Sequence, residues 1–114
     1  MRADIARRFA IDCDRDGLSA NAVDWWLNAA ADYLEIPNDE MYKICILAAK
    51  QALEKTTMPH EIDRLFECSP NITNHLERIS TTHKTEAELF SGLFKDKIRS
   101  KPATASTGTQ PVIT

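Results

Sequence analysis

Apolar residues recur at helical spacing along most of the chain, and few β-branched residues alternate with polar ones. In the stretch 39–55 one apolar stripe is widened by further apolar neighbours, which is typical of a central helix packed on several sides. This stripe consists of Met41, Ile44, Cys45, Ala48 and Ala52. A second stripe in the stretch 20–35 should pack on it, and it is formed by Val23, Trp26, Leu27, Ala30 and Leu34.

Capping residues and prolines divide this pattern into separate helices. Asn38 precedes two acids at the start of one helix, and Pro59 and Pro70 suit first helical positions, where the missing N–H is harmless. Residues 85–88, Thr-Glu-Ala-Glu, have the sequence of a capping box. Helices are expected over about residues 3–11, 20–35, 39–55 and 85–99, with two shorter ones beginning at 59 and 70. The predicted fold class is all-α, a compact bundle of five or six short helices.

Length and composition favour one domain. With 114 residues, 43% of them hydrophobic, the chain is long enough for one core and too short for two. We therefore expect a single helical domain over residues 1–100. Residues 102–114 carry no charged side chain and are rich in Thr, Ser, Ala and Gly. Such a composition predicts a disordered tail over residues 101–114.

Charge and cysteine usage point to a compartment. The formal net charge of −3 gives no general attraction to nucleic acids or anionic membranes. No apolar run approaches the ~20 residues that span a bilayer, and the N-terminal residues do not form a secretory signal. The three cysteines, Cys13, Cys45 and Cys68, show no CxxC spacing. We therefore expect free thiols and a cytoplasmic location.

One short acidic segment, Asp-Cys-Asp-Arg-Asp-Gly at residues 12–17, places three carboxylates at alternating positions before a glycine. It resembles the first half of an EF-hand calcium loop, in which alternating side chains supply oxygens and the glycine permits a sharp turn. The second half departs from the motif, because the position of the bidentate glutamate falls on Val23. The resemblance implies calcium ligation by Asp12, Asp14, Asp16, the Leu18 carbonyl and Asp24.

Residues 59–80 form two short helices around a turn, and this segment resembles a helix-turn-helix. The outer face of the second helix carries Asn71, Asn74 and Arg78. Asn and Arg read adenine and guanine through bidentate contacts, so these residues are the candidates for base recognition. The turn lacks the usual glycine, and the weakly acidic segment offers few phosphate contacts.

Four aromatic residues are candidates for partner binding. Trp25 projects away from the stripe of its own helix, on the flank that it shares with Tyr33. Phe90 and Phe94 lie on the apolar half of the last helix, whose far end is basic. Either these faces close the core, or they bind a protein partner or a second copy of the chain.

Signals for catalysis are few. His60, His75 and His83 have neither HExxH nor Cys/His metal spacing, and the few glycines form no phosphate loop. Cys13 beside carboxylates would be a poor nucleophile, because negative charge disfavours its thiolate. The sequence therefore predicts a small non-enzymatic regulatory or adaptor protein that acts through protein–protein contacts and needs no cofactor. A calcium-binding module and a DNA-binding regulator are the alternatives.

Overall fold

The computed structural model describes residues 2–99, and this range consists of helices joined by short connections. The helices are α1 (Arg2–Arg15), α2 (Ser19–Glu35), α3 (Asp39–Lys55), α4 (Pro59–Glu67), α5 (Ser69–Ser80) and α6 (Lys84–Arg99). The predicted all-α bundle is thereby confirmed. Within this range no helix is long and apolar enough to cross a membrane. The predicted tail, 101–114, lies outside the described residues.

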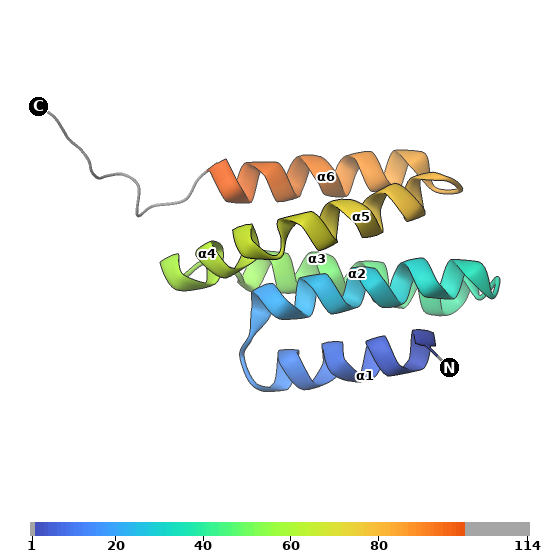
Figure 1. Cartoon of the computed structure of the whole chain (residues 1–114), viewed down its shortest axis with the longest axis horizontal. Coiled ribbons are helices and arrows are strands. Elements are labelled where there is room, and N and C mark those ends of the chain that lie inside the picture. Colours follow the sequence, from blue (N-terminus) through green and yellow to red (C-terminus); the bar gives the residue numbers. More distant parts are fainter. Residues whose placement is uncertain (1, 100–114) are drawn as a thin grey trace, which may run out of the picture.

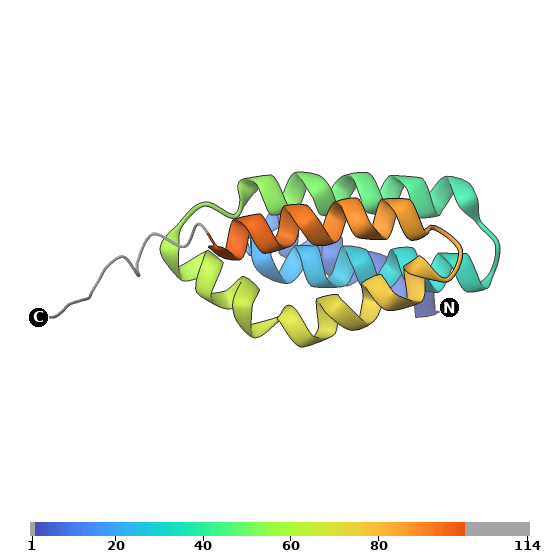
Figure 2. The same cartoon turned by 90° about the horizontal axis from the view of Figure 1, so that it is seen from above.

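The helices lie side by side in layers (Figure 1). α1 packs on one side of α2, whereas α3 and α5 pack on its other sides. α6 covers α3 and α5 on the side away from α1, and α4 turns the chain from α3 into α5 (Figure 2). α3 and α6 run in the same direction, and α5 runs opposite to both.

The central helix is α2, so the prediction that the 39–55 helix is central was wrong. α2 packs against α1, α3, α4 and α5, whereas α3 packs against α2 and α6. The side chains of Ile44 and Leu47 on α3 consequently remain 49% and 57% exposed. Alanines explain the difference, because Ala22 and Ala29 are fully buried and short enough to let other helices approach α2 closely.

Most helix starts follow the expected chemistry. Asn38 caps α3, since its Oδ1 accepts a hydrogen bond from the Met41 N–H at 3.1 Å. Prolines occupy the first turns of α4 and α5 as predicted. The capping box at 85–88 does not start α6, because the helix begins at Lys84 and the His83 carbonyl already accepts from the Ala87 N–H at 3.0 Å.

One connected core of buried side chains runs through the bundle. Between α1 and α2 it is built mainly from alanine, with Ala3, Ala6 and Ala10 at helical spacing and at most 3% exposed. The remainder of the core holds larger side chains, among them Leu27, Tyr42, Cys45, Ile72, Ile79 and Phe90. Fixing α5 and α6 on this core leaves a groove between their outer edges.

Candidate partner-binding groove

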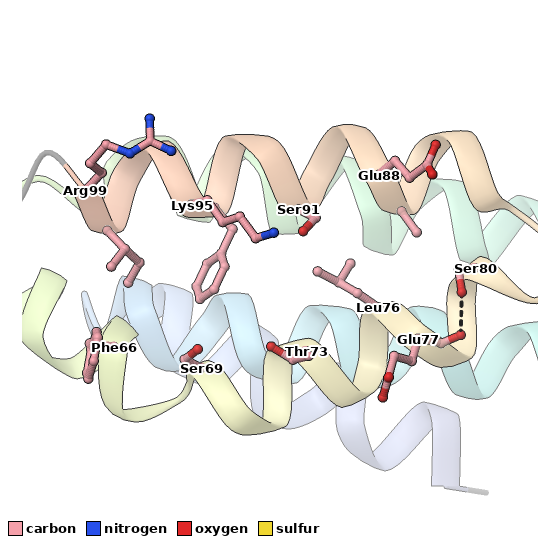
Figure 3. Close-up of a pocket in the computed structure, with 13 residues that line it drawn as sticks. Phe66, Ser69, Thr73, Leu76, Glu77, Ser80, Glu88, Ser91, Lys95 and Arg99 are labelled. Atoms are coloured by element: carbon pink, nitrogen blue, oxygen red, sulfur yellow. Dashed lines mark hydrogen bonds between the residues drawn. The ribbon is translucent and has the colours of Figure 1, made fainter.

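A groove of about 560 Å³ lies between α5 and α6 (Figure 3). Its floor is apolar and is formed by Leu76, Ala87, Phe94 and Ile98, with Phe66 of α4 at one end. Its two edges are polar and are formed by Ser69, Thr73, Glu77 and Ser80 on α5 and by Glu88, Ser91, Lys95 and Arg99 on α6. An apolar floor between two polar edges is the general form of a groove that accepts an amphipathic helix.

Short side chains keep this groove open. Ser69 and Thr73 on α5 and Ser91 on α6 line its middle, and none of them is long enough to close over the floor (Figure 3). Phe66 at the end of the groove is 60% exposed. Exposed aromatic side chains of this kind often anchor protein partners.

The charged residues of the groove are separated along its length. Glu77 and Glu88 lie near one end, where α5 finishes and α6 begins (Figure 3). Lys95 and Arg99 lie toward the opposite end, near Phe66. The separation follows from the antiparallel course of α5 and α6, which places the last turns of one beside the first turns of the other.

The four aromatic residues predicted as partner contacts have different surroundings. Phe94 lies in the floor of the groove and is 6% exposed. Tyr33 and Phe90 are fully buried, so neither side chain can contact a partner directly. Trp25 is half-buried and stacks on Phe9, with ring centroids 4.8 Å apart and an angle of 26° between the rings.

The Tyr33 side chain can be buried because its hydroxyl is hydrogen-bonded within the protein. Its hydroxyl donates to Oδ1 of Asp4 and accepts from Nε of Arg7 at 3.2 Å, so its one polar atom is satisfied against α1. Burial and the hydrogen bond to Asp4 raise the pKa of this phenol, against the opposing effect of Arg7. The hydroxyl therefore stays protonated at neutral pH and holds α1 on α2.

The acidic segment 12–17 is a helix end. α1 extends to Arg15, beyond the predicted end near residue 11. The Leu18 N–H donates to the Cys13 carbonyl at 2.8 Å, and the Gly17 N–H donates to the Asp14 carbonyl at 3.2 Å. Gly17 has φ of 77°, the left-handed conformation that glycine adopts without strain. These bonds form a Schellman motif, which explains the glycine without a bound cation.

The carboxylates predicted as calcium ligands have protein partners. Asp12 pairs with Arg15 at 2.9 Å, and Asp16 lies 3.7 Å from the same guanidinium. Asp14 Oδ2 accepts from Trp26 Nε1 at 2.7 Å. Over residues 2–99 no three His, Cys, Asp or Glu side chains are grouped so that they could hold a metal ion. Calcium binding stays a prediction, and it would require these contacts to rearrange.

The cysteine thiols are free. Partial burial and then the charges of Asp14, Asp16, Asp12 and Asp24 raise the pKa of Cys13. Burial raises the pKa of Cys45 and Cys68 to about 11. At neutral pH all three are therefore thiols, which are weak nucleophiles.

The face of α5 predicted to read bases borders α2 on one side, where Arg78 is partly buried. Arg78 donates to Oδ1 of Asp32 at 2.6 Å and to Glu35 at 2.5 Å. Burial disfavours the charged form of this guanidinium and so lowers its pKa. The hydrogen bonds to the two carboxylates have the larger, opposite effect, and the pKa is raised overall. Asn71 Nδ2 donates to Asp24 at 3.4 Å, whereas Asn74 is exposed. Two of the three residues therefore have partners within the chain.

No family model matches the chain, and no curated protein or solved structure matches it either. The geometry of the groove and the charges around it are therefore the features that bear on function.

Proposed function

We propose that this protein is a non-enzymatic adaptor or regulator that binds an amphipathic helix of a protein partner in the groove between α5 and α6. The observation that carries the proposal is the combination of an open apolar floor with acids at one end and bases at the other. The partner helix would place its apolar stripe on the floor near Phe94. Its acidic side chains would lie beside Lys95 and Arg99.

Charge and helix dipole together favour one direction for the partner. The C-terminal end of a helix carries a partial negative charge, which suits the Lys95 and Arg99 end of the groove. The N-terminal end is partially positive and suits Glu77 and Glu88. The preferred partner is therefore a helix with basic residues in its first half and acidic residues in its second half, running parallel to α6.

A designed peptide tests this proposal without knowledge of the natural partner. The probe is a labelled peptide of about 14 residues, which spans ~20 Å as a helix. It has leucines at helical spacing, lysines in its first half and glutamates in its second half. The control peptide has the same composition with the two charges interleaved. Fluorescence anisotropy should show about tenfold tighter binding of the charge-separated peptide, because several edge ion pairs each contribute up to ~1 kcal/mol.

Two neighbouring residues on α5 provide a matched pair of variants. Thr73 lines the groove and Asn74 does not, and both are exposed. Thr73→Arg should place a long cation over the floor and abolish peptide binding, whereas Asn74→Arg should leave binding unchanged. Both variants should keep the wild-type melting temperature within a few degrees. Equal effects of the two substitutions, or equal affinity for the two peptides, would overturn the proposal.

A further inference from the structure

The described chain ends at the basic end of the groove. Ile98 and Arg99, its last two residues, both line the groove, and Arg99 lies at the end near Phe66 (Figure 3). The residues that follow, 100–114, are therefore attached at one end of an open apolar floor. We call residues 102–114, the uncharged part of this stretch, the C-terminal segment. A segment that is attached beside a groove binds it without the entropic cost of bringing two molecules together.

The C-terminal segment is long enough to turn back along the groove. Ala87 and Arg99 both line the groove from α6, and the twelve positions between them correspond to ~18 Å of helix. Val112 follows Arg99 by 13 positions, and a flexible chain of that length has a root-mean-square extension of about 20 Å. The effective concentration of a tethered segment is highest when this extension matches the span. Val112 and Ile113 can therefore reach the part of the floor that Ala87 lines.

The composition of the C-terminal segment suits a groove with charged edges. The segment carries no Lys, Arg, Asp or Glu, so it places no like charge beside the acids or the bases of the groove. Its threonine and serine hydroxyls can exchange hydrogen bonds with Ser69, Thr73 and Ser91, which line the middle of the groove. Val112 and Ile113 are its largest aliphatic side chains, and burying them on the floor is favourable.

The same composition makes the segment easy to displace. An uncharged segment forms no ion pair with either end of the groove, whereas the charge-separated partner helix pairs with both ends. The effective concentration of a segment on a short flexible tether is of millimolar order. A contact with a millimolar dissociation constant therefore fills about half of the grooves, and a partner helix that binds more tightly replaces it.

We propose that the C-terminal segment binds in the α5–α6 groove of its own chain and is displaced when the partner helix binds. This inference rests on the proposed function of the groove and adds a regulatory element to it. The segment turns back beyond Arg99 and runs antiparallel to α6, with Val112 and Ile113 packed on the floor. Any event that holds the segment away from the groove increases the affinity for the partner.

Two-dimensional ¹H–¹⁵N NMR tests the contact without any partner. The full chain is compared with a chain that ends at Lys101. Truncation should shift the backbone amides of Thr73 and Ser91, whereas those of Ile5 and Phe9 should not move, because α1 lies on the opposite side of the bundle from α6 (Figure 1). A synthetic peptide of residues 102–114, added to the truncated chain at millimolar concentration, should restore the spectrum of the full chain.

A paired substitution in the full chain identifies the apolar contact. Val112→Ser combined with Ile113→Ser removes both aliphatic side chains and should reproduce the shifts caused by truncation. Thr107→Ser combined with Thr109→Ser is the matched control, because it changes two residues of the same segment and keeps their hydroxyls. The control should leave the amides of the groove where they are in the wild type. Equal shifts in the two double variants would overturn the inference.

Fluorescence anisotropy with the charge-separated peptide measures the competition. The truncated chain should bind this peptide about two- to fivefold more tightly than the full chain, because no segment then occupies the groove. Groove shifts on truncation without peptide binding to either chain would support the contact of the segment and refute the proposed function. Equal peptide binding to both chains, with no shift at Thr73 and Ser91, would overturn the inference and leave the proposed function standing.

Two further outcomes would place the segment elsewhere. Truncation could shift the amides of Leu47 and Leu93, which line a hollow between α3 and α6, instead of those in the groove. Alternatively, the shifts of the full chain could depend on protein concentration, which would show that the segment binds a second copy. Either result would overturn the inference.

Discussion

The ion pairs of Arg78 give the sharpest prediction for stability. Asp32 on α2 has a side chain that is only 7% exposed, and it receives Arg78 at 2.6 Å and Arg2 at 3.2 Å. Arg2 is 75% exposed and is the weaker partner, since solvent screens exposed charges. Arg78→Ala would therefore leave a buried carboxylate with one exposed cation.

The magnitude follows from these environments. Removing one partner of a fully buried pair costs about 3–5 kcal/mol, because the other charge is left without compensation. Here the loss should be smaller, because Arg2 remains and Arg78 itself is 31% exposed. The additional bond to Glu35 contributes less than about 1 kcal/mol, because Glu35 is 58% exposed. We expect Arg78→Ala to lower the free energy of unfolding by about 2–3 kcal/mol, a large part of a typical total of about 5–15 kcal/mol.

Urea denaturation followed by circular dichroism measures this loss. Arg64→Ala is the control, because Arg64 forms an exposed pair with Glu67 at 3.8 Å and should change stability by less than about 0.5 kcal/mol. Adding Asp32→Asn to Arg78→Ala should recover part of the loss, because the unpaired buried charge is then removed. If Arg78→Ala leaves stability unchanged but abolishes salt-sensitive binding to duplex DNA, the structural role is refuted and the DNA-binding alternative is favoured.

Two further predictions concern pH and calcium. Burial raises the pKa of the Cys45 and Cys68 thiols to about 11, so above pH 9 the unfolded chain releases protons that the folded chain retains. The free energy of unfolding should therefore fall as pH rises from 9 to 11, by up to about 1.4 kcal/mol per thiol per pH unit. Urea titrations at several pH values measure this fall, and a free energy of unfolding that does not change with pH would contradict the prediction. For calcium, Asp14 accepts a hydrogen bond from Trp26, so coordination at this carboxylate should change the surroundings of the indole ring. The calcium hypothesis thus predicts a saturable change in tryptophan fluorescence, with a higher melting temperature, that magnesium does not produce and that Asp12→Ala abolishes; no change at millimolar calcium would reject it.

Helix type and number could be predicted from sequence because the relevant signals are local. Apolar spacing, the Asn38 cap and the prolines each act within one or two turns, and the structure contains the corresponding helices. The choice of central helix could not be predicted in this way. The apolar pattern of α3 is broader, but burial depends on which neighbours approach, and Ala22 and Ala29 allow that approach on α2.

The candidate site was less accessible to sequence reasoning. The groove depends on short side chains, Thr73 and Ser91, that face each other from two consecutive helices, and apolar spacing within either helix does not report how the two pack. The segment 12–17 shows the opposite difficulty. Asp and Gly at that spacing fit both a calcium loop and a helix end, and the backbone bonds around Gly17 form the helix end. Exposed Phe9 was also missed, although it follows Ile5 by one helical turn and stacks on Trp25.

The alanine contact between α1 and α2 has a consequence for how the chain opens. α1 packs essentially on α2 alone, through the small side chains Ala3, Ala6 and Ala10 and through the half-exposed stack of Phe9 on Trp25. Detaching α1 therefore exposes little apolar surface from that helix and leaves the contacts among the other five helices intact. The amide hydrogens of α1 should then exchange with solvent through partial openings, while those of α2 that face α3 and α5 exchange only when the whole bundle unfolds. The N-terminal helix is thus a separable layer on a five-helix unit that holds the groove.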